Sequence, residues 1–138
     1  MSIYRGDVFW WNCPEHDRPH LLNKVRPVVV LSNDICNMNS AVITVAPLTS
    51  KVRKPYPTQV PVVLNDGVSI VLADKVTAIP IEELGDKMCH LKSWQMAQID
   101  QAIRIQFALD EHPEDEYLSM YRGLGISDLA RMRRGGDM

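Results

Sequence analysis

The stretch NKVRPVVVLSND, residues 23–34, places an arginine and a proline directly before a run of four apolar residues. The run 28–31 is short and rich in β-branched side chains, which is typical of a strand covered on both faces. Pro27 is tolerated as the first residue of a strand, where its missing N–H breaks no ladder, and it favours an extended conformation at Arg26. We therefore predict a buried strand over 27–32 that holds the Arg26 guanidinium at its mouth.

The composition indicates one domain of a globular protein. The chain has 138 residues, of which 46% are hydrophobic and 23% charged, enough to bury a sizeable core. No apolar run approaches the roughly 18 residues of a membrane span, and MSIYRGD is not a signal-peptide pattern, so we expect a cytoplasmic protein with no membrane partner. Cys13, Cys36 and Cys89 are odd in number and irregularly spaced, which favours reduced thiols over a disulfide framework.

Charge is unevenly distributed along the chain. The net charge of −2 argues against a protein that coats nucleic acid indiscriminately. Residues 1–75 nevertheless carry 8 Lys and Arg against 6 Asp and Glu, whereas residues 76–138 carry 7 against 11. The basic residues of the first part cluster at Lys24, Arg26, Lys51, Arg53 and Lys54. These numbers predict a local anion site in a mildly acidic protein.

Short strands recur along the first two thirds of the sequence. Besides 27–32, strands are predicted over 7–12, 41–47, 58–64, 69–74 and 75–79. Asn65-Asp66-Gly67, between two of them, is a strong hairpin signal because such a turn needs a positive φ. The polar segment 13–25 contains two prolines and is long enough to be a functional loop.

Helical signals are concentrated near the end of the first 110 residues. Ser93 can cap a helix that runs to about Leu109, with a core-facing stripe of Met96, Ile99, Ile103 and Phe107. Single helical turns are predicted over 33–39, capped by Asn33 or Asp34, and over 80–85, and a short last helix over 127–134. Several short strands and one closing helix favour a small, mostly β domain of the α+β class, built as an antiparallel barrel.

A second stretch, VAPLTSKVRK (45–54), could complete an anion site. Thr49 and Ser50 follow a predicted strand end as Arg26 precedes one, and further basic residues come after them. If the two strands are neighbours, a guanidinium fork, two hydroxyls and several ammonium groups could converge on one phosphate and stabilise the charge of an in-line attack. The alternative is a solvated basic loop beside a structural arginine.

Other constellations are less complete. Cys13, His16 and His20 are residue types that bind zinc, but a fourth ligand at matching spacing is missing, and either histidine could instead transfer a proton or lie exposed in a loop. Neither a G-x-S-x-G elbow nor a glycine-rich phosphate loop is present. The tryptophans, either base-stacking platforms or core and interface anchors, are Trp10, Trp11 and Trp94.

The motifs GDVFWWN, RPVVVLSND, VITVAPLTSK, YPTQVPV, SIVLADKVTAI, LGDKMCHL and QIDQAIRIQFAL follow one another in the order characteristic of a known family. Over about residues 3–110 the chain resembles the MazF/PemK toxins of type II toxin–antitoxin systems. The resemblance divides the chain into a MazF/PemK-like barrel domain, 1–112, and a C-terminal extension, 113–138.

This resemblance implies an SH3-like barrel with a C-terminal helix, assembled as a homodimer. It further implies an endoribonuclease, an mRNA interferase that cuts single-stranded RNA at a short sequence without a metal or other cofactor. The ribose 2′-OH would attack the phosphate to leave 2′,3′-cyclic phosphate and 5′-OH ends. A cognate antitoxin would inhibit the enzyme, its acidic tail occupying the basic groove.

The resemblance also assigns residues to the site. The family's catalytic arginine, in an R-P-V/A pattern, falls on Arg26, and its catalytic threonine or serine, in a P-L-T-S pattern, falls on Thr49, with Ser50 adjacent. Arg26 would stabilise charge and take part in proton transfer, although an arginine is a poor base, and Thr49 would stabilise the phosphorane oxygens. The residues expected to contact RNA are His20, Lys24, Ser50, Lys51, Arg53, Lys54, Lys75 and Thr77.

Two segments depart from the family pattern. The loop EHDRPHLLNKVRP, 15–27, lacks the usual G-x-E-type stretch, and Asp74-Lys75-Val76-Thr77 replaces a D-Q-I/V-R pattern, which moves a positive charge by two positions. Two alternatives therefore stand beside the nuclease: a gyrase-poisoning toxin of the same barrel, which binds without cutting RNA, and a catalytically weak nucleic-acid-binding module. The presence of both Arg26 and Thr49 in their expected contexts favours the nuclease.

Overall fold

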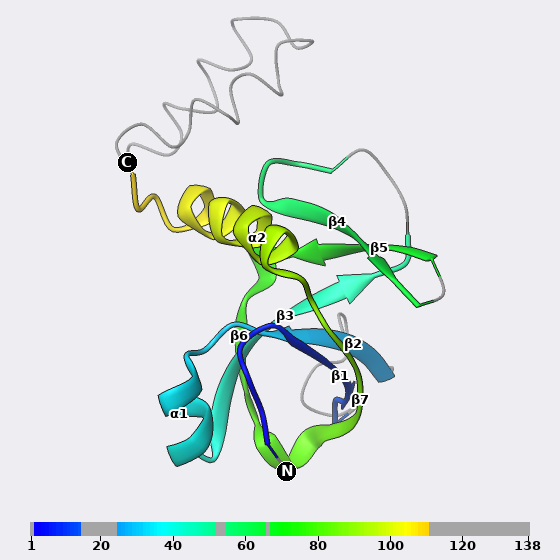
Figure 1. The fold of residues 1–138 in the computed structure, drawn as a ribbon, viewed down its shortest axis with the longest axis vertical. Helices are drawn as coiled ribbons and strands as arrows, with labels where there is room; N and C mark the ends of the chain where they lie inside the picture. The colour runs from blue at the N-terminus through cyan, green and yellow to red at the C-terminus, as the bar shows by residue number, and fades with distance from the viewer. Residues whose placement is uncertain (1, 15–24, 52–54, 66, 111–138) are drawn as a thin grey trace, which may run out of the picture.

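A computed structural model describes residues 2–14, 25–51, 55–65 and 67–110 (Figure 1). Its strands are β1 (Asp7–Asn12), β2 (Val25–Val30), β3 (Val42–Thr49), β4 (Gln59–Leu64), β5 (Gly67–Leu72), β6 (Thr77–Pro80) and β7 (Leu84–His90). The helices are α1 (Asp34–Asn39) and α2 (Ser93–Gln106), and the 3-10 turns are η2 (Ala73–Lys75) and η3 (Ile81–Glu83). None of these described helices is long and apolar enough to cross a membrane.

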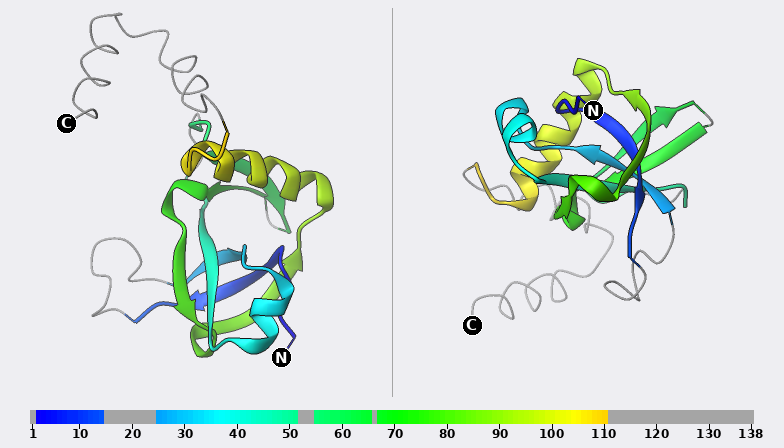
Figure 2. Two further views of the ribbon diagram at one scale, coloured as in Figure 1. Left: turned by 90° about the vertical axis from the view of Figure 1, so that its left-hand side faces the viewer. Right: turned by 90° about the horizontal axis from the view of Figure 1, so that it is seen from below.

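Every strand pairing in the described residues is antiparallel, in the order β4-β5-β3-β2-β1-β7, with β6 also paired to β3. The long strand β3 joins the two halves of the sheet, since its first part pairs with β2 and β6 and its end pairs with β5. The sheet curls around this shared strand, and α2 lies against the half formed by β4 and β5 (Figures 1 and 2). The predicted mostly β, antiparallel barrel with a C-terminal helix is confirmed.

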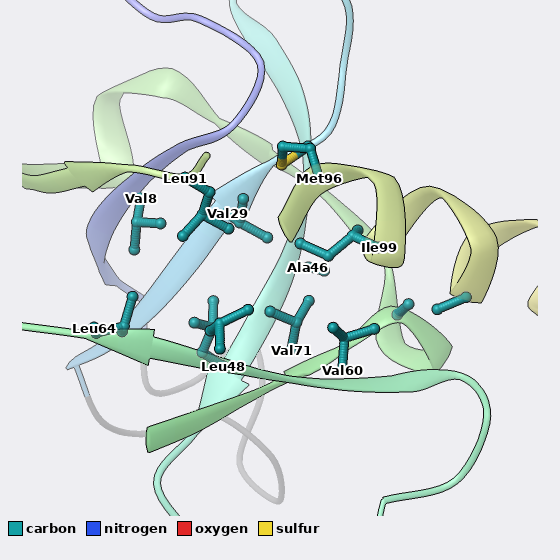
Figure 3. Close-up of a cluster of buried hydrophobic side chains, with 13 residues drawn as sticks. Val8, Val29, Ala46, Leu48, Val60, Leu64, Val71, Leu91, Met96 and Ile99 are labelled. Carbon is teal, nitrogen blue, oxygen red and sulfur yellow. The ribbon is translucent and has the colours of Figure 1, made fainter. Parts of the chain in front are cut away.

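The sheet is buried on both faces, as the β-branched run predicted. Val29 belongs to a cluster that packs between the sheet and α2 with Val71 and Ile99 (Figure 3). Val28 and Phe9 belong to a second cluster on the other face. All five side chains are 0% exposed, so the two clusters fix which way the strand residues among them face.

Local turn signals are confirmed where they were strong. Asn33 caps α1, accepting a hydrogen bond of 2.8 Å from the Cys36 N–H, and the hairpin closes at the Leu64–Gly67 pair, with Gly67 at φ +137°. The three cysteines are free thiols, as expected. The predicted helix over 127–134 lies outside the described residues.

Several boundaries were wrong for physical reasons. β2 begins at Val25, so Pro27 is its third residue and not its first. A proline is tolerated there because β2 pairs with β3 only from Val28 onward, which leaves that edge of β2 unpaired at Pro27. The expected strand 75–79 is a 3-10 turn followed by β6, and the expected helix 80–85 shrinks to η3. The strand β7 was missed, because LGDKMCH carries polar residues and an irregular register instead of an alternating pattern.

Helix α2 also differs from its prediction at both ends. Lys92, not Ser93, occupies the N-cap position, and Gln95 Oε1 accepts the Lys92 backbone N–H at 2.9 Å. Phe107 is the C-cap residue and 54% exposed, since the helix ends before it can join the buried stripe. The residues that α2 buries are Gln95, Met96, Ile99, Ala102 and Ile105, with Ile103 half-buried.

Candidate active site

Strands β2 and β3 pair over only three residues and then separate. Their register runs from Val30–Val45 to Val28–Pro47, and beyond it β3 pairs only with β5, on the edge opposite to β2. Continuing the β2–β3 register by two residues would place Arg26 opposite Thr49. In such a register the two side chains would share one face of the sheet, and both do line one groove at this divergence.

A groove of about 380 Å³ opens where the two strands separate, a size typical of a small-ligand site. Its lining is Trp10, Val25, Arg26, Pro27, Leu48, Thr49, Ser50, Lys51, Leu64, Gly67, Val68, Ser69 and Met88. Leu48 and Leu64 also belong to the cluster beneath α2, so the groove has an apolar floor (Figure 3). Its polar side chains come from β2, from the end of β3 and the two residues after it, and from Ser69 of β5.

The cations of this groove have no carboxylate partner in the described part of the chain. Arg5 pairs with Asp100, and Lys75 and Lys87 lie 3.9 and 3.1 Å from carboxylate oxygens of Asp74 and Asp7. Arg26 and Lys51 make no such pair among the residues described. Unneutralised cations beside an apolar floor favour the binding of an anion.

The Thr49 hydroxyl is oriented by its own turn. Its Oγ1 accepts a hydrogen bond of 3.2 Å from the Lys51 N–H, which leaves the hydroxyl proton to be donated. Thr49 is half-buried, whereas Ser50 and Lys51 are exposed. A tetrahedral anion in the groove would therefore meet a fixed hydroxyl donor on the β3 side and a guanidinium fork on the β2 side.

The backbone that carries Arg26 is braced by a buried tryptophan. Arg26 pairs with Trp11 of β1, which is 1% exposed and donates its indole N–H to Glu83 Oε1 at 2.8 Å. A side chain on such a rigid strand is better positioned than one on a loop. The backbone of β2 therefore holds Arg26 in a fixed position at the groove, ready to bind an anion.

The structure gathers some of the predicted site residues and separates others. Arg26, Thr49, Ser50 and Lys51 all line the groove. Lys75 and Thr77 do not: Thr77 pairs with Val45, on the edge of β3 opposite to the one that β2 occupies. Four predicted site residues lie outside the described part of the chain: His20, Lys24, Arg53 and Lys54. His16 and most of the 13–25 loop lie outside it as well.

Sequence reasoning missed the apolar part of the lining. Val25, Val68 and Met88 carry no chemical signal, and only the strand pairing brings them to one groove. Trp10 was singled out as a tryptophan, but the run FWW contains no alternation that would show which aromatic residue faces outward.

Comparisons with known proteins agree with this architecture. Residues 4–107 match the family model described as a PemK-like, MazF-like toxin of type II toxin–antitoxin systems. Endoribonuclease EndoA of Bacillus subtilis is 34% identical over 117 residues, covering 79% of this chain and 97% of that protein. Endoribonuclease MazF3 of Mycobacterium tuberculosis is 35% identical over 92 residues, covering 64% of this chain and 88% of its own length.

Solved structures show the same fold. A mycobacterial endoribonuclease in complex with its cognate antitoxin superposes with a TM-score of 0.67 at 23% identity, over 80% of this chain and 99% of that one. The Mycobacterium tuberculosis toxin MazF-mt6 gives a TM-score of 0.63 at 29% identity, over 76% and 99% of the two chains.

Proposed function

The chain belongs to the family of PemK-like, MazF-like toxins of type II toxin–antitoxin systems, and we propose that it is an endoribonuclease that cuts single-stranded RNA, including mRNA, at a short sequence. The observation that carries this proposal is the placement of Arg26 and Thr49 at the β2–β3 divergence, in a groove whose cations have no carboxylate partner among the described residues. Relatives named endoribonucleases support it.

In the proposed reaction the ribose 2′-OH attacks the adjacent phosphate. The P–O2′ bond forms, the P–O5′ bond breaks, and the proton lost by the 2′-OH is matched by one gained at the leaving 5′ oxygen. The products carry 2′,3′-cyclic phosphate and 5′-OH ends. Negative charge accumulates on the non-bridging oxygens of the phosphorane, and this is the charge that the groove must stabilise.

Arg26 and Thr49 divide this task. Guanidinium groups keep their proton at neutral pH, so Arg26 acts by charge and by its fork of N–H donors on the phosphate oxygens. Thr49 donates its hydroxyl proton to a phosphorane oxygen while the Lys51 N–H holds its Oγ1. Ser50 and Lys51 contact the flanking RNA backbone, and no metal is required for the step.

The same family membership supports the biological setting that we propose. The toxin acts as a homodimer in the cytoplasm, where mRNA is available, and a cognate antitoxin inhibits it by covering the groove. An acidic peptide segment complements the cations there, which have no carboxylate partner among the described residues. The barrel domain spans residues 1–112, in keeping with a family match that ends at residue 107, and residues 113–138 form an extension.

The test is an RNA cleavage assay in EDTA. A long RNA without stable structure is incubated with the wild-type protein, Arg26→Ala and Arg104→Ala, the last removing an exposed arginine of α2 that pairs with Asp110. We expect discrete cuts by the wild type and by Arg104→Ala, and at least about a 100-fold loss in Arg26→Ala. RNA that stays intact with the wild type would contradict the proposal and favour a binding toxin of the same fold.

A further inference from the structure

Strand β1 contains three consecutive aromatic residues, and one of them faces the groove. Phe9 and Trp11 are 0% and 1% exposed within the core, whereas Trp10 between them is 38% exposed and lines the groove. A tryptophan that served only to pack the core would be buried like its two neighbours. The exposure of the Trp10 indole in the groove therefore suits a role in binding.

The β1–β7 pairing is irregular at this point. Val8 pairs with Cys89 but Phe9 with Lys87, so Met88 is an extra residue on β7. Between the Phe9–Lys87 and Trp11–Leu84 pairs, Trp10 alone opposes two residues of β7. Irregularities of this kind re-aim side chains and are frequent beside active sites.

The two irregularities deliver Trp10 and Met88 to the same groove as the catalytic pair. Trp10 pairs with Pro27, the residue next to Arg26 on β2. Its backbone lies between β2, where it pairs with Pro27, and β7, so the position from which the indole projects is fixed. An aromatic face and a thioether in the same groove as an arginine match the two parts of a nucleotide, its base and its phosphate.

We infer that Trp10 is a stacking platform for the nucleobase next to the scissile phosphate, with Met88 packing at its side. This inference rests on the proposed nuclease function and adds a binding residue to it. Trp10 positions the substrate and takes no part in proton transfer. Because every base has a π-face, the contact strengthens binding without selecting one base.

The experiment compares the binding of an RNA that contains the mapped cleavage site, with a single 2′-deoxy nucleotide that prevents cutting. Trp10→Leu keeps an apolar strand residue but removes the aromatic face, Trp10→Phe keeps a smaller face, and Trp94→Leu makes the same change at a tryptophan that is 58% exposed and outside the groove lining. We expect binding about 5- to 150-fold weaker in Trp10→Leu, partly restored in Trp10→Phe and unchanged in Trp94→Leu.

A second arm replaces the bases on either side of the cut, one at a time, by abasic sites. If Trp10 stacks on one of these bases, Trp10→Leu weakens binding to that abasic RNA by less than about twofold, because the partner of the indole is already absent. Thermal unfolding of each variant shows whether a loss of binding comes from a loss of folding.

The outcomes separate this inference from the proposed function. A wild type that cuts RNA, with a Trp10→Leu variant that binds as tightly as the wild type, would overturn the stacking role alone and point to a protein contact for the indole. Equal losses on intact and abasic RNA would also overturn it. A wild type that cuts no RNA would remove both.

Discussion

Arg26 and Thr49 occupy positions that would face each other if the β2–β3 register continued two residues beyond its last pair, Val28–Pro47. The β2–β3 ladder ends at Val28–Pro47, whereas β3 continues through Thr49–Ile70 to pair with β5 on its other edge. A guanidinium and a hydroxyl thus face a shared gap on backbones that the sheet holds in place. The proposed catalytic pair lies where β2 leaves β3.

Cleavage should require the hydroxyl group of Thr49 and not the branched shape of its side chain. Thr49→Val keeps the branched side chain but removes the donor, and we expect kcat to fall about 100- to 1,000-fold, as for loss of one donor to an oxyanion. Thr49→Ser keeps the donor and should stay within about tenfold of the wild type. Single-turnover cleavage of a short RNA measures both, and a Thr49→Val enzyme with wild-type kcat would refute this role.

Lys51 should contribute to RNA binding through phosphate charge alone. Each phosphate neutralised on a single strand changes the slope of log K against log salt by about 0.7, so Lys51→Gln should make the slope shallower by about that amount. The matched control is Lys75→Gln, since Lys75 lies beside Asp74 and outside the groove lining. RNA-binding titrations at several salt concentrations measure these slopes. Identical slopes for the wild type and Lys51→Gln would place Lys51 away from the RNA.

The buried Asp7 carboxylate should make stability depend on pH. Burial raises its pKa, but hydrogen bonds from the Tyr4 N–H, His90 and Lys87 outweigh this and hold the pKa of Asp7 below its ordinary 3.8. The stabilisation is therefore complete above pH 3.8 and is lost as pH falls through the lower folded value.

The corresponding variant is Asp7→Asn, which should lower the free energy of unfolding at pH 7 by about 1–3 kcal/mol. The difference in the free energy of unfolding between the wild type and Asp7→Asn should become smaller as pH falls below 4. Denaturant unfolding at pH 7, 5 and 3 measures it, with the exposed Asp86→Asn as the control expected to change little. A difference in the free energy of unfolding that stays constant down to pH 3 would show that the charge of Asp7 does not contribute to stability.

The end of α2 offers a substitution that should stabilise the protein. Ala108 has φ +53°, and the Leu109 N–H donates to the Arg104 carbonyl at 2.9 Å, so the helix closes in a geometry that favours glycine. We expect Ala108→Gly to raise the free energy of unfolding by about 0.5–1 kcal/mol without changing cleavage. Ala97→Gly, in the exposed middle of the same helix, should lower it by about 1 kcal/mol. Effects of the same sign in chemical denaturation would refute this reading of the helix end.

The sequence predicts those features of the fold that depend on neighbouring residues. The bounds 7–12 match β1, and the α1 cap is Asn33, one of the two candidates, because period, cap and turn chemistry are local. Strand β7 was missed because its polar residues and shifted register make sense only beside β1. The burial of Trp11 and the exposure of Trp10 also depend on partners far along the chain.

The candidate site divides in the same way. Arg26 and Thr49 could be named from their flanking motifs, but their position opposite each other follows from the β2–β3 register, to which both strands contribute. Lys75 and Thr77 carried a plausible charge pattern, yet the pairing of β6 with the far edge of β3 keeps them out of the groove lining. Tertiary pairing decides which of several basic residues share a surface.

The most direct test of the account is a single-atom change in the substrate. An RNA with a 2′-deoxy nucleotide at the mapped cut removes the attacking hydroxyl and leaves the groove contacts unchanged. We predict that the wild type binds this RNA, does not cut it, and leaves 5′-OH and 2′,3′-cyclic phosphate ends on the all-ribose control. Cutting of the deoxy substrate at the same site, or 5′-phosphate ends on the control, would contradict the proposed chemistry at Arg26 and Thr49.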